Sequence, residues 1–274
     1  MKNGLAIWHY PHRSMEENIS FFAVQGFESL SLLGREFVKE LDSVTLPEVL
    51  RQADIVLTVH FALPKTHASE HTEPFYDQIR RIGRWQEEHG LISVLSFDVY
   101  QSTRDNIRPY VDFVLENVPD CRIAVEDFGL TDGERSQLEH LKDCRRFGYL
   151  IDIGHMFIRL RGENTSGKTL LSNHPDECPP CAAPGLEAFR TAFRSKTFPV
   201  FEIHLHNNDG VRDLHQFLEN GELDVSVIAQ LLRETGYEGI LTIESAPGYQ
   251  FPCAGQEADD GILRSFRWWQ SLCS

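Results

Sequence analysis

The chain has 274 residues, of which 41% are hydrophobic, so it is long enough to bury one barrel-sized core. Its formal net charge is −15, and this acid excess argues against a broad contact with nucleic acid, whose phosphates bind clustered lysine and arginine. The sequence contains no run of ~20 apolar residues that would span a membrane, and its start lacks the layout of a signal peptide. We therefore expect a cytoplasmic protein.

Short apolar runs alternate with amphipathic segments along the chain. The apolar runs predict eight strands, at residues 5–10, 27–34, 55–62, 91–98, 121–127, 149–155, 198–207 and 239–246. The segments with helical periodicity predict helices at residues 14–26, 47–53, 74–89, 106–117, 131–147, 186–195, 225–235 and 257–272. Ser14 with Glu17, and Thr131 with Glu134, have the spacing of a capping box at the start of two of these helices.

This alternation of eight strands and eight helices predicts an α/β fold, a single-domain (β/α)8 TIM barrel over residues 1–274. The exception is residues 156–184, whose Gly, Asn, Pro and Ser content predicts an irregular insertion that could act as a lid. Within it, Cys178 and Cys181 are compatible either with half of a structural zinc site or with ordinary thiols in a proline-stiffened loop.

Side chains that can bind metal stand at the ends of six predicted strands. Any one of them is as readily a hydrogen-bonded polar group at a strand end. Six such side chains, each at the end of a different predicted strand, indicate one shared site, because the C-terminal ends of the strands of a TIM barrel meet at one mouth. Carboxylate and imidazole groups together are typical ligands of divalent metals. The six residues are His60, Asp98, Glu126, Asp152, His204 and Glu244.

Four further residues are candidates with plainer alternatives. His206 alternates with His204 and so lies on the same face of the strand, where it could support a ligand instead of binding the metal itself. Trp8 and Tyr249 follow the first and last strands, where aromatic rings either line a sugar pocket or pack at the rim. Arg212 either holds a substrate hydroxyl or phosphate, or is a solvated charge.

The order and spacing of these motifs resemble the xylose-isomerase-like TIM barrels. This superfamily holds sugar and sugar-phosphate isomerases and epimerases, and also the endonuclease IV class of zinc phosphodiesterases. The resemblance covers nearly the whole chain and rests on IAVEDF, LIDIGH, EIHLHNND, the Asp213-Leu214-His215 segment and LTIES. It implies the barrel fold and one to three divalent ions, with Zn or Mn ahead of Co or Mg.

The isomerase branch of this resemblance implies one cation held by Glu126, Asp152, His204 and Glu244. The two glutamates would also exchange protons with a substrate carbon beside a polarised carbonyl, and His155 would act on a substrate oxygen. We expect this function first: an isomerase or epimerase acting on a small sugar, sugar phosphate or polyol. The other expected substrate contacts are His60, Arg212, Trp8 and Tyr249.

The endonuclease IV branch implies three zinc ions and a phosphoester substrate. Asp98 stands where that pattern has a histidine. Because the chain is acidic and its early loops are short, a small phosphoester fits better than DNA. A barrel that only binds its ligand is a third possibility, and the number of bound ions would separate the three. The sequence leaves open whether the chain forms a homo-oligomer. The additional ligands in this branch would be His60, Asp98, His155, Asp213 and His215.

Overall fold

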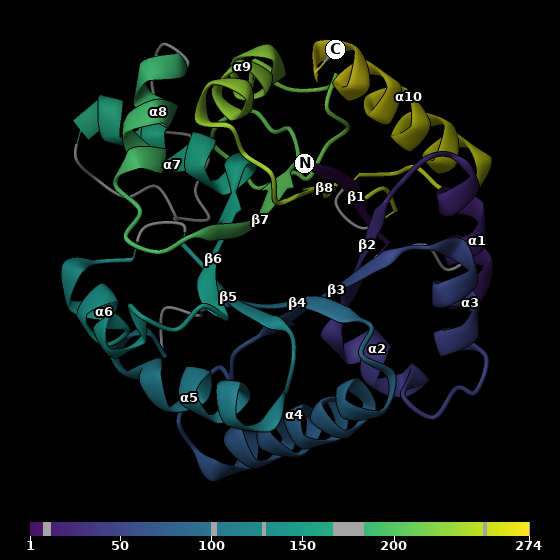
Figure 1. Cartoon of the computed structure of the whole chain (residues 1–274). Coiled ribbons are helices and arrows are strands. Elements are labelled where there is room, and N and C mark those ends of the chain that lie inside the picture. The colour runs from purple at the N-terminus through teal and green to yellow at the C-terminus, as the bar shows by residue number, and fades with distance from the viewer. Residues whose placement is uncertain (8–11, 100–102, 128–129, 167–183, 249–250, 274) are drawn as a thin grey trace.

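The computed structural model describes residues 1–7, 12–99, 103–127, 130–166, 184–248 and 251–273. Eight parallel strands close into a barrel, each pairing with the next in sequence and β8 pairing with β1 (Figure 1). The strands are β1 (Lys2–Ala6), β2 (Ser29–Leu33), β3 (Val56–Ala62), β4 (Ile92–Asp98), β5 (Arg122–Glu126), β6 (Phe147–Asp152), β7 (Val200–Leu205) and β8 (Ile240–Ile243). The predicted TIM barrel is confirmed.

Helices surround the barrel in the order of the chain (Figure 1). No helix among the described residues is both long and apolar enough to cross a bilayer. The helices are α1 (Met15–Val24), α2 (Gly34–Glu40), α3 (Leu46–Ala53), α4 (Ser69–His89), α5 (Arg108–Asn117), α6 (Asp132–Ser136), α7 (Ile153–Ser166), α8 (Leu186–Arg194), α9 (Val225–Thr235) and α10 (Gln256–Cys273), with 3₁₀ turns at Arg104–Asn106 and Glu139–Leu141.

The inner face of the barrel changes from apolar to ionisable along the strands. Side chains alternate faces along a strand, so Ala124 and Glu126 share one face of β5, as Leu150 and Asp152 do on β6. Apolar residues near the strand starts form a small cluster of their own, and the ionisable residues follow towards the C-terminal ends. This inner cluster contains Val94, Ala124, Leu150, Phe201 and Ile240.

The last helix joins the end of the chain to its beginning. Phe266 of α10 stacks on Phe27 with ring centroids 4.0 Å apart, and Trp269 Nε1 donates a hydrogen bond to Asn3 Oδ1 at 3.1 Å. These contacts complement the pairing of β8 with β1, so the C-terminal segments are needed to close the cylinder.

Two predicted boundaries near the site are wrong. The sixth strand ends at Asp152 instead of 155, because α7 begins directly after it. Residues 153–166, expected to be partly irregular, form this helix because Ile153, Met156, Phe157 and Leu160 recur at helical spacing and pack against the core. Residues 167–183, with Cys178 and Cys181, lie outside the described residues.

Two helices also differ from the prediction. The helix expected at 131–147 is only the short α6 followed by a 3₁₀ turn, because Gln137 turns away to accept a hydrogen bond from the backbone N–H of Ile107 and to donate one to the carbonyl of Arg104. Helix α2 was not predicted, and it follows β2 without a loop. The capping boxes at Ser14 and Thr131 are both present.

Candidate metal centre

Nine metal-capable side chains meet at the C-terminal mouth of the barrel. They form four overlapping groups, and within each group one donor atom per residue lies within 4.8 Å of the others. Because the groups share members, we treat the nine residues as one mouth cluster. The groups are His60, Asp98 and Glu126; Glu126, Asp152 and His155; Asp152, His206 and Glu244; and His155, His206, Asp213 and His215.

The first group joins the ends of β3, β4 and β5. His60 Nε2 lies 3.1 Å from Asp98 Oδ1 and 3.8 Å from Glu126 Oε2. The other ring nitrogen, Nδ1, is 2.9 Å from Ser96 Oγ. Ser96 therefore fixes the ring so that Nε2 faces the two carboxylates, which is how a hydrogen-bonded imidazole is oriented towards a metal.

His155 owes its position to the direct passage from β6 into α7. Its backbone N–H, in the first turn of the helix, donates to Asp152 Oδ1 at 2.7 Å. First-turn N–H groups have no partner within the helix, so a side chain at the preceding strand end can satisfy them. This places His155 Nδ1 2.8 Å from Glu126 Oε1 and Nε2 3.1 Å from Asp213 Oδ2.

His206 belongs to two of the four donor groups. Its Nε2 is 3.2 Å from Asp152 Oδ1, and its ring stacks on that of His215 with centroids 3.9 Å apart. Gly154 permits this position, because a Cβ at residue 154 would overlap the His206 ring. Although His206 is fully buried, neither of its nitrogens makes a well-formed hydrogen bond with any described residue, and the same is true of Glu244 Oε2.

Asp213 and His215 are carried by the loop that follows β7. Asn207 anchors this loop, donating to the carbonyls of Leu218 and Leu223 and accepting from the Leu223 N–H. His215 has φ +44°, a left-handed conformation that costs energy in a non-glycine residue and often marks a functional site. Its Nδ1 donates to the carbonyl of Glu244 at 3.0 Å, which leaves Nε2 facing Asp213 Oδ1 at 3.1 Å.

His204, expected to be a ligand, lies deeper in the barrel and belongs to none of the four groups. Its Nδ1 is 3.0 Å from Glu244 Oε2 and its Nε2 is 3.4 Å from Glu202 Oε1. His206 instead stands with Asp152 and Glu244. The alternation of β7 places both histidines on one face but does not indicate which is level with the other strand ends.

The remaining predicted substrate contacts are not in the cluster. Arg212 is exposed, and its guanidinium is held by Asp209, with Nε 2.7 Å from Oδ2. Trp8 and Tyr249 lie outside the described residues. Sequence reasoning missed Glu202 and Asn207; the only signal for Glu202 was a carboxylate inside a strand whose one other polar residue is His204.

Among the described residues, only histidines form ion pairs with the five carboxylates of the mouth cluster. Burial, followed by the charge of Asp98, raises the pKa of Glu126 well above its usual range. Burial acts to lower the pKa of His215, but Glu244 and Asp213 outweigh it and raise this pKa to about 9.

Burial and ion pairing also oppose each other at His155. Burial favours the neutral imidazole, but Asp152 and Asp213 outweigh it and hold the pKa of His155 well above its usual range. Burial likewise acts to raise the pKa of Asp152, yet His155 and His206 hold it well below the usual range. Without metal, His155 and His215 are therefore protonated beside Asp152 and Asp213, so protons supply part of the positive charge that a bound cation would bring.

The family follows from comparison with known proteins. A model of the xylose isomerase-like TIM barrel family matches residues 32–272. The chain belongs to this family. It is also 28% identical over 133 residues to an uncharacterised protein of Methanocaldococcus jannaschii, a match that spans 48% of this chain and 36% of that protein.

Three solved structures in this family's fold cover nearly all of the chain. The IolI protein with a bound zinc atom has a TM-score of 0.67 at 13% identity, covering 100% of this chain and 98% of its own. D-psicose 3-epimerase with D-tagatose from Clostridium cellulolyticum H10 has a TM-score of 0.64 at 12% identity, covering 100% of both chains. An AP endonuclease, family 2, from Brucella melitensis has a TM-score of 0.62 at 11% identity and 99% coverage of both. At these identities the likeness establishes the fold alone, and most of the neighbours are enzymes.

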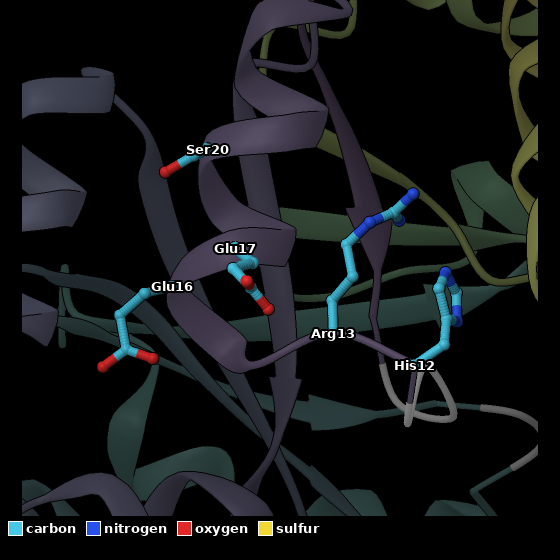
Figure 2. Close-up of a pocket in the computed structure, with 5 residues that line it drawn as sticks. All are labelled: His12, Arg13, Glu16, Glu17 and Ser20. Carbon is cyan, nitrogen blue, oxygen red and sulfur yellow. The ribbon is translucent and has the colours of Figure 1, made fainter.

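A separate hollow is lined by residues that belong to none of the four donor groups. It measures about 480 Å³ and lies beside the start of α1 (Figure 2). Its charged groups already have partners: Arg13 pairs with the buried Asp259, and Glu17 completes the capping box of α1. The residues that line it are His12, Arg13, Glu16, Glu17 and Ser20.

Proposed function

We propose that the mouth cluster binds more than one divalent ion and that the protein hydrolyses a small phosphoester. The observation that carries this proposal is the number of donors. A single ion takes about four to six protein ligands, whereas nine donor residues lie in four overlapping groups. An isomerase with one ion would not need Asp213 and His215, and the loop after β7 holds His215 in a left-handed conformation that costs energy.

The charge of the mouth cluster supports more than one ion. Five carboxylates contribute five negative charges, and their partners in the described residues are histidines, which must be neutral to bind metal. One divalent ion offsets only part of this charge and would leave the mouth repelling an anionic substrate. Three ions offset all of it, so the mouth would then attract a phosphoester dianion.

The groups suggest how the donors would divide among the ions. The ions, when bound, would act as Lewis acids towards phosphoryl oxygens and lower the pKa of an attacking water. Zn fits the histidine-rich groups, and Mn also accepts this mixture of oxygen and nitrogen donors. The division we propose is His60, Asp98 and Glu126 for one ion; Asp152, His206 and Glu244 for a second; and His155, Asp213 and His215 for a third, with Glu126 and Asp152 free to bridge.

The exposure of the carboxylates in the mouth cluster indicates the side from which a substrate would approach. Asp98 and Asp213 have 39% and 42% of their side chains exposed, while Glu126, Asp152 and Glu244 are buried. A substrate would therefore reach the cluster from the side of Asp98 and Asp213. Arg212, on the same loop as Asp213, is the proposed contact for a substrate oxygen, and Trp8 and Tyr249 remain proposed substrate contacts.

A sugar isomerase or epimerase is the second candidate, favoured by the placement of two glutamates. Glu126 shares one donor group with Asp152, and Glu244 shares another with the same aspartate. Two buried carboxylates beside one common ligand are the arrangement that proton exchange on two faces of a sugar would use. The epimerases of the same fold are consistent with this candidate, in which His155 would contact the substrate oxygen.

Metal analysis followed by a substrate panel tests the two candidates. The purified protein is dialysed against Zn²⁺ or Mn²⁺, its ions are counted by mass spectrometry, and their positions are found by anomalous diffraction. We expect two or three ions per chain and release of phosphate from small phosphoesters. One ion per chain together with proton exchange beside a ketose carbonyl would establish the second candidate instead, and no bound ion would contradict both.

A further inference from the structure

A carboxylate lies inside the barrel beneath the mouth cluster. Glu202 is fully buried on β7. Its Oε1 accepts hydrogen bonds from Thr58 Oγ1 at 2.9 Å and from Thr242 Oγ1 at 2.7 Å. Burying an acidic group is costly, and apolar replacements in such positions often stabilise a protein. The presence of Glu202 in the barrel interior therefore calls for a role other than stability.

Glu202 contacts the mouth cluster through one side chain. His204 Nε2 lies 3.4 Å from Glu202 Oε1, and His204 Nδ1 lies 3.0 Å from Glu244 Oε2. The imidazole is buried between the two carboxylates, one on its own strand and one at the end of β8. The order Glu202, His204, Glu244 thus leads from the interior of the barrel to a proposed metal ligand.

We propose that Glu202 and His204 are positioning residues that orient Glu244 towards Asp152 and His206. The proposal rests on the metal centre proposed above and adds two residues that bind no ion themselves. A glutamate ligand has three rotatable bonds, so a contact on one oxygen fixes how its carboxylate presents itself. Thr58 and Thr242 hold Glu202, and Glu202 holds the ring of His204 against that oxygen.

The competing role for His204 is direct binding of an ion. In that case, removing it would abolish binding as completely as removing His206 does. Positioning predicts a weaker effect, because Asp152, His206 and Glu244 would all remain. Loss of a residue that orients a metal ligand typically weakens metal binding by about 10- to 100-fold.

The test compares Glu202→Gln with Ser31→Ala in the full-length protein. Glutamine keeps an oxygen for Thr58 and Thr242 but removes the charge that faces His204. Ser31, also buried inside the barrel, makes no hydrogen bond through its hydroxyl with a described residue and serves as the control. Co²⁺ affinity is measured from its absorption spectrum, melting temperature is measured without metal, and a metal-free crystal structure of each variant locates the Glu244 carboxylate.

We expect Glu202→Gln to bind Co²⁺ at least tenfold more weakly, with a displaced Glu244 carboxylate and a metal-free melting temperature no lower than that of the wild type. A purely structural role would lower the melting temperature instead. A Glu244 carboxylate that keeps its position in Glu202→Gln would overturn the proposed positioning role. A His204→Gln variant that loses Co²⁺ binding as completely as His206→Gln would overturn it as well. Wild-type protein that binds no Co²⁺ would overturn the proposed function, while the crystal structures would still decide the positioning.

Discussion

Gly154 lies directly against the imidazole of His206, so that the first turn of α7 and the end of β7 meet without a side chain between them. Asn208 Nδ2 reinforces this contact by donating to the carbonyl of Gly154 at 3.1 Å. The position of His206 in the mouth cluster therefore depends on the absence of a Cβ in a neighbouring element.

We predict that Gly154→Ala weakens metal binding by about tenfold or more, because the added methyl group must displace the His206 ring. Titration with Co²⁺ measures the change. Gly185→Ala is the matched control, since a Cβ there meets nothing within 4 Å. Equal affinities of the two variants would mean that His206 is not a ligand.

Asp98 and Asp213 should be ligands of different ions. Each lies in a donor group that does not contain the other. We expect Asp98→Asn and Asp213→Asn each to lose about one ion per chain while keeping the rest, because an amide is a poorer ligand than a carboxylate. Anomalous diffraction should locate the missing ion beside His60 in the first variant and beside His215 in the second.

The exposed Asp77 on α4 provides the control for these two variants. Asp77→Asn should bind as many ions as the wild type. Loss of every ion in both site variants would contradict separate binding positions and would indicate a single shared ion.

The metal-free protein should lose stability as the pH rises from about 6.5 to 9. The pKa of His215 is raised from 6.5 to about 9 in the folded chain. A group with a raised folded pKa contributes stability that is fully present below its unfolded pKa and is lost as the pH passes the folded value. Burial acts to lower the pKa of His204, but Glu244 outweighs it and raises this pKa. Burial acts in the same way on His155, where Asp152 and Asp213 outweigh it, so both histidines should add to the loss of stability.

Melting temperatures of chelator-treated protein across this pH range measure the effect. His215→Gln should show a shallower decline than the wild type. Saturating Zn²⁺ should remove most of the decline, because bound metal requires the neutral imidazole that high pH favours. A metal-free melting temperature that rises towards pH 9 would contradict the protonated state inferred for these histidines.

Asn207 should be essential for the loop that carries Asp213 and His215. Its buried side chain makes hydrogen bonds to backbone groups of Leu218, Leu223 and Asn208. Asn207→Ala leaves these groups without partners, and we expect a loss of about 2–4 kcal/mol in unfolding free energy. Urea denaturation measures it, with the exposed Asn220 replaced by alanine as the control.

The barrel was predictable from the sequence because its signal is repeated eight times. Each buried strand leaves an apolar run, and ionisable residues such as Asp152 and Glu244 mark where several of the runs end. The start of α7 was not predicted, because residues 153–155 continue the apolar run of the strand and the Gly, Asn, Pro and Ser content of residues 156–184 indicates an irregular segment, whereas burial of Met156 and Phe157 decides the conformation.

The sequence does not indicate how deep within the barrel each site residue lies. His204 and His206 are equivalent in a period-two pattern. Asp152 is the register partner of His204 but shares a donor group with His206, so the grouping depends on strand tilt and stagger, which are properties of the closed cylinder. Glu202 was missed for the same reason, since whether it faces the barrel interior or the helices follows from the paired sheet.

The pairing of β1 with β8 has a consequence for biosynthesis. The first strand leaves the ribosome with one edge unpaired, and its partner is made only after about 230 further residues. Until then the nascent chain exposes an open edge and the apolar surface that α10 later covers. Newly made chains should therefore depend on chaperones, and premature stop codons before β8 should yield aggregates instead of smaller folded barrels.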